Sequence, residues 1–74
     1  MTEDCRLYFW MPRNEVAFLQ AIVDSHEHLA RIRTERNESD RALIVLMYDA
    51  SQQTEIHEMS QGFEASLGQK LDFV

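Results

Sequence analysis

Apolar residues along this chain repeat with two different periods, which predict where strands and helices lie. Residues 42–48 form the longest unbroken apolar run; it is too short to cross a membrane and suits a strand buried on both faces. In residues 6–11, Leu7, Phe9 and Met11 alternate with Arg6, Tyr8 and Trp10, which predicts a strand. Pro12 ends that strand because proline has no backbone N–H to donate to a hydrogen bond of the sheet. Residues 29–36 and 69–74 predict two further strands.

Two segments have the apolar spacing of amphipathic helices. In residues 15–25, the apolar side chains fall within an arc of roughly 160° at 100° per residue, and Asn14 is a suitable N-cap. Residues 52–66 predict a second helix, with Asp49 or Ser51 as its cap. Both helices are therefore expected to lie with one apolar side on a sheet.

Two glycines fall in or next to the second helix. Gly62 lies inside it and costs about 1 kcal/mol relative to alanine, so close packing against another element is expected there. Gly68 follows the last apolar position and predicts the C-terminal end of the helix, because glycine readily takes the left-handed conformation of that end.

Residues 37–40, Asn-Glu-Ser-Asp, have turn chemistry and predict a hairpin between the strands at 29–36 and 42–48. A loop of two or four residues gives one register, in which the opposed pairs on one face are Thr34 with Leu43, Ile32 with Val45 and Ala30 with Met47. In this register Leu43, Val45 and Met47 meet the helices. Ile44, Leu46 and Tyr48 point the other way, with Arg33 opposite Ile44 and Arg31 opposite Leu46.

The predicted order of elements is β-α-β-β-α-β in one domain of residues 1–74. With right-handed crossovers, this order predicts an α+β fold. The expected form is a ferredoxin-like two-layer sandwich with an antiparallel sheet of strand order 4-1-3-2 and both helices on one face.

Residues 18–30, Phe-Leu-Gln-Ala-Ile-Val-Asp-Ser-His-Glu-His-Leu-Ala, resemble the helix-to-strand segment of a family of short bacterial single-domain proteins, known only as a domain of unknown function. The layout of the whole chain resembles an ACT domain, a small regulatory ferredoxin-like module. Such segments are expected to carry glycine where His28 stands, and residues 11–14 lack the glycine-bearing ligand loop of amino-acid-binding ACT domains. The resemblance implies the fold but not amino-acid sensing, and it assigns no site residue. An ACT-like module of this kind is expected to act by protein association or by small-molecule regulation through an effector.

Length and charge narrow the classes of function. A chain of 74 residues buries a small core, and its single cysteine, Cys5, excludes an internal disulfide, so association with another copy is the expected source of added stability. The net charge of −6 disfavours general nucleic-acid binding. Residues 1–6 are acidic and do not resemble a signal peptide, and no run suits a membrane span, which predicts a cytoplasmic protein.

The sheet face away from the helices is the main candidate site. It is predicted to combine aromatic, aliphatic and arginine side chains: Tyr8, Trp10, Arg31, Arg33, Ile44, Leu46 and Tyr48. An apolar patch rimmed by arginine is typical of a protein interface, so we expect a homodimer. A terminal segment folded over the face, or a face that is merely apolar, explains the same pattern.

Single-stranded RNA binding is a second hypothesis for the same face. Tyr8, Trp10 and Tyr48 are placed to stack bases beside the two arginines, as in RNA-recognition motifs of this topology. The third strand lacks the Arg/Lys-Gly-aromatic signature of those motifs, and Ile44 and Leu46 are poor stacking platforms. Nucleic acid is therefore the less favoured partner.

Metal binding is a third hypothesis, based on His26, His28 and His57 at one end of the predicted fold. The His-x-His spacing is a weak signal, and solvated loop histidines explain it equally well. Arg13 at the start of the first helix suits an anion, but a glycine-rich phosphate cradle is missing. The sequence therefore predicts no cofactor, no catalytic residue and no enzymatic activity.

Overall fold

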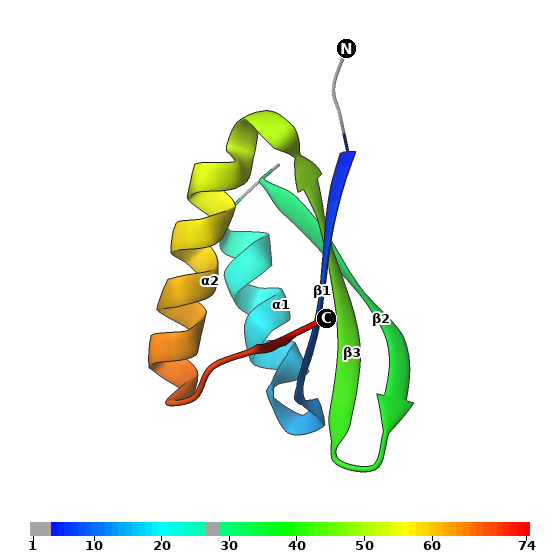
Figure 1. Cartoon of the computed structure of the whole chain (residues 1–74). Helices are drawn as coiled ribbons and strands as arrows, with labels where there is room; N and C mark the ends of the chain where they lie inside the picture. The colour runs from blue at the N-terminus through cyan, green and yellow to red at the C-terminus, as the bar shows by residue number, and fades with distance from the viewer. Residues whose placement is uncertain (1–3, 27–28) are drawn as a thin grey trace.

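The computed structural model describes residues 4–26 and 29–74, which adopt the predicted ferredoxin-like α+β fold (Figure 1). The elements follow one another along the chain as β1 (Asp4–Pro12), the 3-10 turn η1 (Arg13–Glu15), α1 (Val16–Ser25), β2 (Ala30–Glu38), β3 (Arg41–Asp49), the 3-10 turn η2 (Ala50–Gln52), α2 (Gln53–Leu67) and β4 (Asp72–Phe73).

The strands form one antiparallel sheet in the order β2-β3-β1-β4, which is the predicted order 4-1-3-2 read from the opposite edge. Both α1 and α2 cover the same face of this sheet, so the molecule has two layers (Figure 1). We call the opposite side, which these two helices leave uncovered, the outer face of the sheet.

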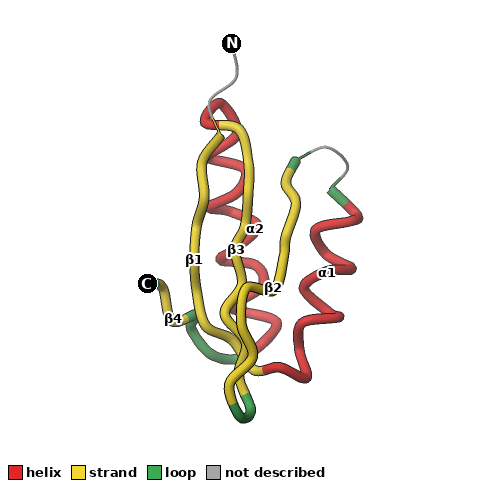
Figure 2. The backbone as a smooth tube through the Cα atoms, turned by 90° about the vertical axis from the view of Figure 1, so that its right-hand side faces the viewer, coloured by secondary structure: helices red, strands yellow, loops and turns green. Residues whose placement is uncertain are grey.

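The last strand is much shorter than predicted, because β4 contains only Asp72 and Phe73. The preceding Leu71 is instead fixed to α2: its backbone N–H donates to Glu64 Oε2 at 2.8 Å, and its side chain is buried in the core. The Phe73 ring meets the Phe9 ring edge-on, at 5.6 Å between centroids. These contacts place β4 against only part of β1 (Figure 2).

The hydrophobic core lies between the sheet and the helices. Its buried members come from alternate positions of the central strands, from the apolar sides of both helices and from the segment between α2 and β4: Phe9, Met11, Leu19, Val23, Ala42, Ile44, Leu46, Ile56, Met59, Phe63 and Leu71. The alternation follows from the strand geometry, in which every second side chain points to the same face.

The hairpin between β2 and β3 has a different register from the predicted one. Glu38 lies opposite Arg41 across a two-residue turn, and a bulge interrupts the pairing between Thr34 and Arg36. Beyond the bulge, Thr34 lies opposite Ile44. The predicted pairing of Thr34 with Leu43 was therefore wrong by one residue. Because successive side chains of a strand alternate between its faces, a shift of one residue exchanges the two faces.

This shift corrects the predicted faces of β3. Ile44 and Leu46 are 0% and 1% exposed in the core, and Tyr48 packs against the core from the same side. The three were expected on the outer face, so that assignment was wrong. The outer face is instead formed by the residues between them, Leu43, Val45 and Met47, which were expected in the core.

The ends of the helices match the predictions in part. Asp49 accepts hydrogen bonds from the backbone N–H and the hydroxyl of Ser51, so the predicted cap forms, although it starts η2 rather than α2. Asn14 does not cap α1, because it lies inside η1. Gly68 ends α2 with φ 78°, and its N–H donates to the Glu64 carbonyl at 2.9 Å, as the C-cap prediction requires.

Candidate interaction surface on the outer face of the sheet

The outer face is built from side chains that alternate with the core positions of the central strands. Tyr8 lies opposite Val45, and Trp10 opposite Leu43. None of these four side chains belongs to the core cluster between sheet and helices. Tyr8, Trp10 and Leu43 are half-buried, whereas Val45 is fully covered between its neighbours. Partly accessible apolar surface therefore flanks the covered Val45.

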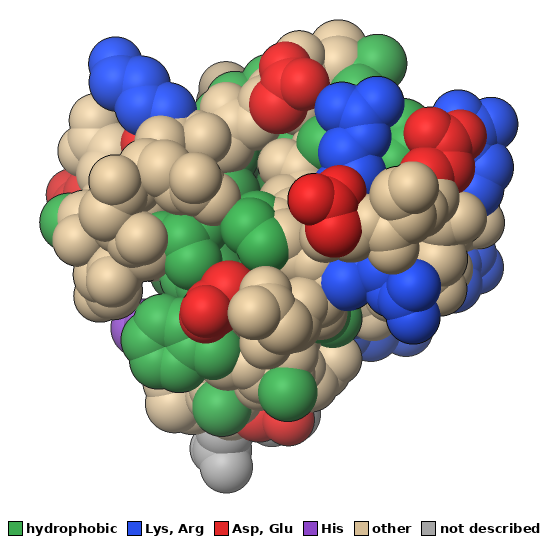
Figure 3. Space-filling model, turned by 90° about the horizontal axis from the view of Figure 1, so that it is seen from below, with side chains coloured by type: hydrophobic (Ala, Val, Ile, Leu, Met, Phe, Trp, Pro, Cys, Tyr) green, Lys and Arg blue, Asp and Glu red, His purple; other side chains and the backbone are tan. Residues whose placement is uncertain are grey.

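Most of the basic residues gather on this face. Five of the seven lysines and arginines of the chain occupy outer-face positions of β1, β2 and β3: Arg6, Arg31, Arg33, Arg36 and Arg41. All five are exposed. In the view from below, Lys and Arg side chains crowd the sheet side of the molecule, with Asp and Glu side chains between them (Figure 3).

Carboxylates on the same face partly neutralise these arginines. Arg33 pairs with Glu35 at 2.6 Å, and Arg36 pairs with Glu38 at 3.0 Å. Arg41 lies 3.9 Å from both Glu38 and a second carboxylate on β4, that of Asp72. Because all these groups are well exposed, each pair contributes only about 0–1 kcal/mol to stability. Their main effect is to make the face charged in both signs.

The indole of Trp10 is already in contact with two cations. The guanidinium carbon of Arg41 lies 4.2 Å from the ring centroid, and that of Arg36 lies 5.5 Å from it. Both distances are within the range of cation–π attraction. A base that stacked on this ring would have to displace an arginine from it.

The residues predicted for this surface divide into two groups. Tyr8, Trp10, Arg31 and Arg33 lie on the outer face, whereas the β3 residues Ile44, Leu46 and Tyr48 lie on the core side. Sequence reasoning missed Leu43, Val45 and Met47, together with the arginines of β1, β3 and the far side of the bulge. The alternation of β1 already placed Arg6 beside Tyr8 and Trp10, so its position was available from the sequence.

The other candidate sites are not assembled in the described part of the chain. His26 lies at the C-terminal end of α1, and His57 lies in α2. His28 lies outside the described residues. Among the residues that the structure describes, no three His, Cys, Asp or Glu side chains are placed to hold a metal ion. His57 instead lies 3.2 Å from the amide nitrogen of Gln61.

Arg13, the candidate for anion binding, has a structural contact. Its Nη1 donates to the Ser39 carbonyl at 3.0 Å, and its backbone N–H donates to the Asp40 carbonyl at 2.9 Å. Both bonds hold the β2–β3 turn against η1. Arg13 therefore serves the packing of the hairpin, and its guanidinium is directed at a carbonyl oxygen.

In the comparisons with known proteins, no family model, no curated protein and no solved structure matches this chain. Within the described residues, neither helix is long and apolar enough to span a membrane.

Proposed function

We propose that this chain is a non-enzymatic association module that forms a homodimer through the outer face of its sheet. The supporting observation is the composition of that face, where half-buried Tyr8, Trp10, Leu43 and Met47 lie among exposed arginines and carboxylates. Aromatic residues, methionine and arginine are the residues enriched at protein interfaces. Regulation by a small molecule, which the resemblance to ACT domains implies, would act on this association.

The charges of the face favour a second copy of the chain as its partner. In a two-fold dimer the same surface meets itself, so a face of one sign would repel its mate. Here the five arginines are accompanied by four carboxylates on the same strands or their rim: Asp4, Glu35, Glu38 and Asp72. A rotated copy therefore finds opposite charges as well as apolar surface.

The same charges make single-stranded RNA the less favoured partner. Affinity for RNA comes largely from cations that are free to neutralise phosphates. Arg33, Arg36 and Arg41 are paired with carboxylates, and two of these arginines lie over the Trp10 ring that a base would need.

Replacing Leu43 with glutamate tests the proposed dimer. Leu43 lies opposite Trp10 and Arg36, so the new carboxylate has a cation nearby in the monomer and the fold is retained. In the dimer the charge would be buried, at a cost of several kcal/mol. We expect light scattering to report a dimer for the wild type at about 100 µM and a monomer for Leu43→Glu. The dissociation constant of the dimer should be at least ~100-fold larger for the variant.

Phe18→Glu is the matched control. Phe18 is also a large apolar side chain, 43% exposed, but it lies on α1 on the opposite side of the molecule. This variant should remain dimeric. A wild type that is monomeric at this concentration would overturn the proposal. If that monomer bound single-stranded RNA with an affinity that falls as salt rises, the RNA alternative would replace it.

A further inference from the structure

The glycine in the interior of α2, Gly62, is not explained by the fold of the chain. Glycine destabilises a helix interior relative to alanine. Gly62 has no positive φ that would require glycine, and a Cβ at this position would meet nothing within 4 Å among the described residues. Neither its backbone conformation nor its packing within the described part of the chain therefore accounts for this exposed glycine.

The space in front of Gly62 belongs to a groove between the two helices. This groove has a volume of about 520 Å³, and its walls come from α2 and from the C-terminal part of α1. Met59, Gly62, Phe63 and Ser66 all line it, and they follow one another on one side of α2 at the spacing i, i+3, i+4, i+7. Four residues of one helix form the hole into which a side chain of a neighbouring helix inserts when two helices pack. The missing Cβ of Gly62 deepens this hole.

The side chains deepest in the groove are apolar. Met59 and Phe63 are 8% and 1% exposed, and Ile22 is half-buried on the α1 side. Phe18 lies one turn before Ile22 on α1, and its ring lies 5.8 Å from that of Phe63, between centroids. Because Phe18 is 43% exposed, it extends the apolar surface beside the groove toward the solvent.

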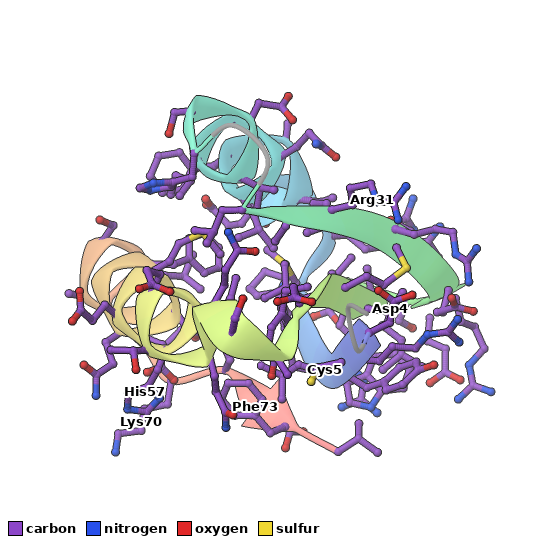
Figure 4. All side chains as sticks on the ribbon, turned by 90° about the horizontal axis from the view of Figure 1, so that it is seen from above. Asp4, Cys5, Arg31, His57, Lys70 and Phe73 are labelled. Carbon is purple, nitrogen blue, oxygen red and sulfur yellow. The ribbon has the colours of Figure 1, made fainter. Side chains whose placement is uncertain are left out.

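The helix layer differs in charge from the outer face of the sheet. Neither α1 nor α2 contains a lysine or an arginine, whereas the two helices carry four carboxylates: Asp24, Glu55, Glu58 and Glu64. Glu55 and Glu58 line the groove, are exposed, and form no ion pair within the described residues. Seen from above, the helices form one side of the molecule, and Arg31 lies on the other side with the strands (Figure 4). The groove therefore suits a cationic partner.

We propose that this groove binds a basic amphipathic helix of a partner protein. An apolar side chain of that helix inserts into the hole around Gly62, and its lysines or arginines lie beside Glu55 and Glu58. A helix fits better than a strand, because the backbone groups of α1 and α2 are bonded within each helix and offer no edge for strand pairing. From Glu55 to Ser66 the lining of α2 is roughly 16 Å long, which a partner helix of about three turns covers.

A second copy of this chain is a poorer occupant of the groove. Two helix layers that met face to face would bring carboxylates together without a lysine or arginine from either helix. The arginines of a second copy lie on its outer face, which could reach the groove only in a head-to-tail contact that competes with the proposed homodimer. The groove and the outer face are separate surfaces, so the partner helix and the homodimer are tested independently.

Fluorescence anisotropy with a labelled, end-blocked peptide tests this inference. The peptide Ala-Lys-Leu-Ala-Arg-Lys-Leu-Ala-Lys-Leu-Ala-Arg-Lys-Leu forms a helix with all its leucines on one side. The protein is the full chain carrying Leu43→Glu, so that self-association through the outer face does not contribute; the wild type is measured in parallel. We expect saturable binding with a dissociation constant of ~50 µM. A peptide of the same composition with its leucines spread around the helix should bind at least ~10-fold more weakly.

Filling the hole tests the role of Gly62. Gly62→Leu places a side chain in the space that the partner would occupy, and the fold is retained because a Cβ there meets nothing within 4 Å and leucine favours a helix. The dissociation constant should rise above about 1 mM. Gln61→Leu is the matched control, because it adds the same side chain at an exposed position of α2 that does not line the groove. It should leave the affinity unchanged, and circular dichroism verifies that both variants are folded.

Charge reversal tests the role of the carboxylates. Glu58→Lys and Asp72→Lys change the net charge of the protein equally, but only Glu58 lines the groove, whereas Asp72 lies on β4. Glu58→Lys should weaken binding about 3–10-fold, as expected when an exposed attractive pair becomes a repulsive one. Asp72→Lys should change the affinity by less than about 2-fold at physiological salt, because distant exposed charges are screened.

Nuclear magnetic resonance locates the bound peptide, and the amide signals of Ile22, Gly62 and Ser66 should shift. Equal affinities of Gly62→Leu and Gln61→Leu, equal affinities of the two peptides, or no binding at about 1 mM would overturn the inference. So would shifts confined to the strands. If the mass of the Leu43→Glu protein increased with concentration and Gly62→Leu prevented that increase, the groove would belong to a second copy and not to a partner protein.

Discussion

At the scale of single residues, the two glycines of α2 have opposite roles. Gly68 adopts φ 78°, which only glycine takes without strain, whereas Gly62 lies in the exposed helix interior, and a Cβ there would meet nothing within 4 Å. The expected close packing at Gly62 was therefore wrong. Gly62→Ala should raise the free energy of unfolding by about 1 kcal/mol, and Gly68→Ala should lower it by about the same amount. Urea unfolding followed by circular dichroism measures both, and equal signs would contradict the assignment.

At the scale of elements, alanine substitutions on the two faces of β3 show which face belongs to the core. Leu46 is 1% exposed and Leu43 is half-buried on the outer face, so the same substitution removes different contacts at the two positions. Leu46→Ala should lower the free energy of unfolding by about 2–5 kcal/mol, and Leu43→Ala by less than about 1 kcal/mol. Unfolding at low micromolar concentration excludes effects on association. The reverse order would restore the predicted register.

At the scale of the whole molecule, stability should depend on protein concentration. A chain of 74 residues has a small core, and a partner that binds only the folded state stabilises it by mass action. We expect the midpoint of thermal unfolding of the wild type to rise by roughly 5–10 °C over a 100-fold increase in concentration.

The Leu43→Glu variant should show no such rise, because its outer face no longer associates. Trp10 is the only tryptophan and lies on that face, so its quenching by acrylamide in the wild type should weaken as concentration increases. A midpoint independent of concentration in both proteins would argue against the dimer.

The order of the elements and the topology of the sheet followed from local patterns. The apolar period changes between strands and helices, Pro12 ends the first strand region, and Gly68 ends α2, and all of these act through neighbouring residues. The outer-face positions of Tyr8 and Trp10 also followed from alternation along β1.

The faces of β3 depended on tertiary structure instead. Residues 42–48 are apolar at every position, so alternation alone could not show which half faced the helices. The hairpin register decided it: the bulge between Thr34 and Arg36 shifts the pairing by one residue, and the helices then cover Ile44 and Leu46. A bulge arises from the balance of turn geometry and packing across two strands, which a linear pattern does not contain.

The same distinction applies to the surfaces proposed for binding. Arg36 is visible in the sequence, but its meeting with Arg41 above Trp10 requires β2, β3 and β1 to lie side by side. Local periodicity sets which segments become strands and helices, whereas pairing between distant segments determines which side chains and edges remain available to a partner.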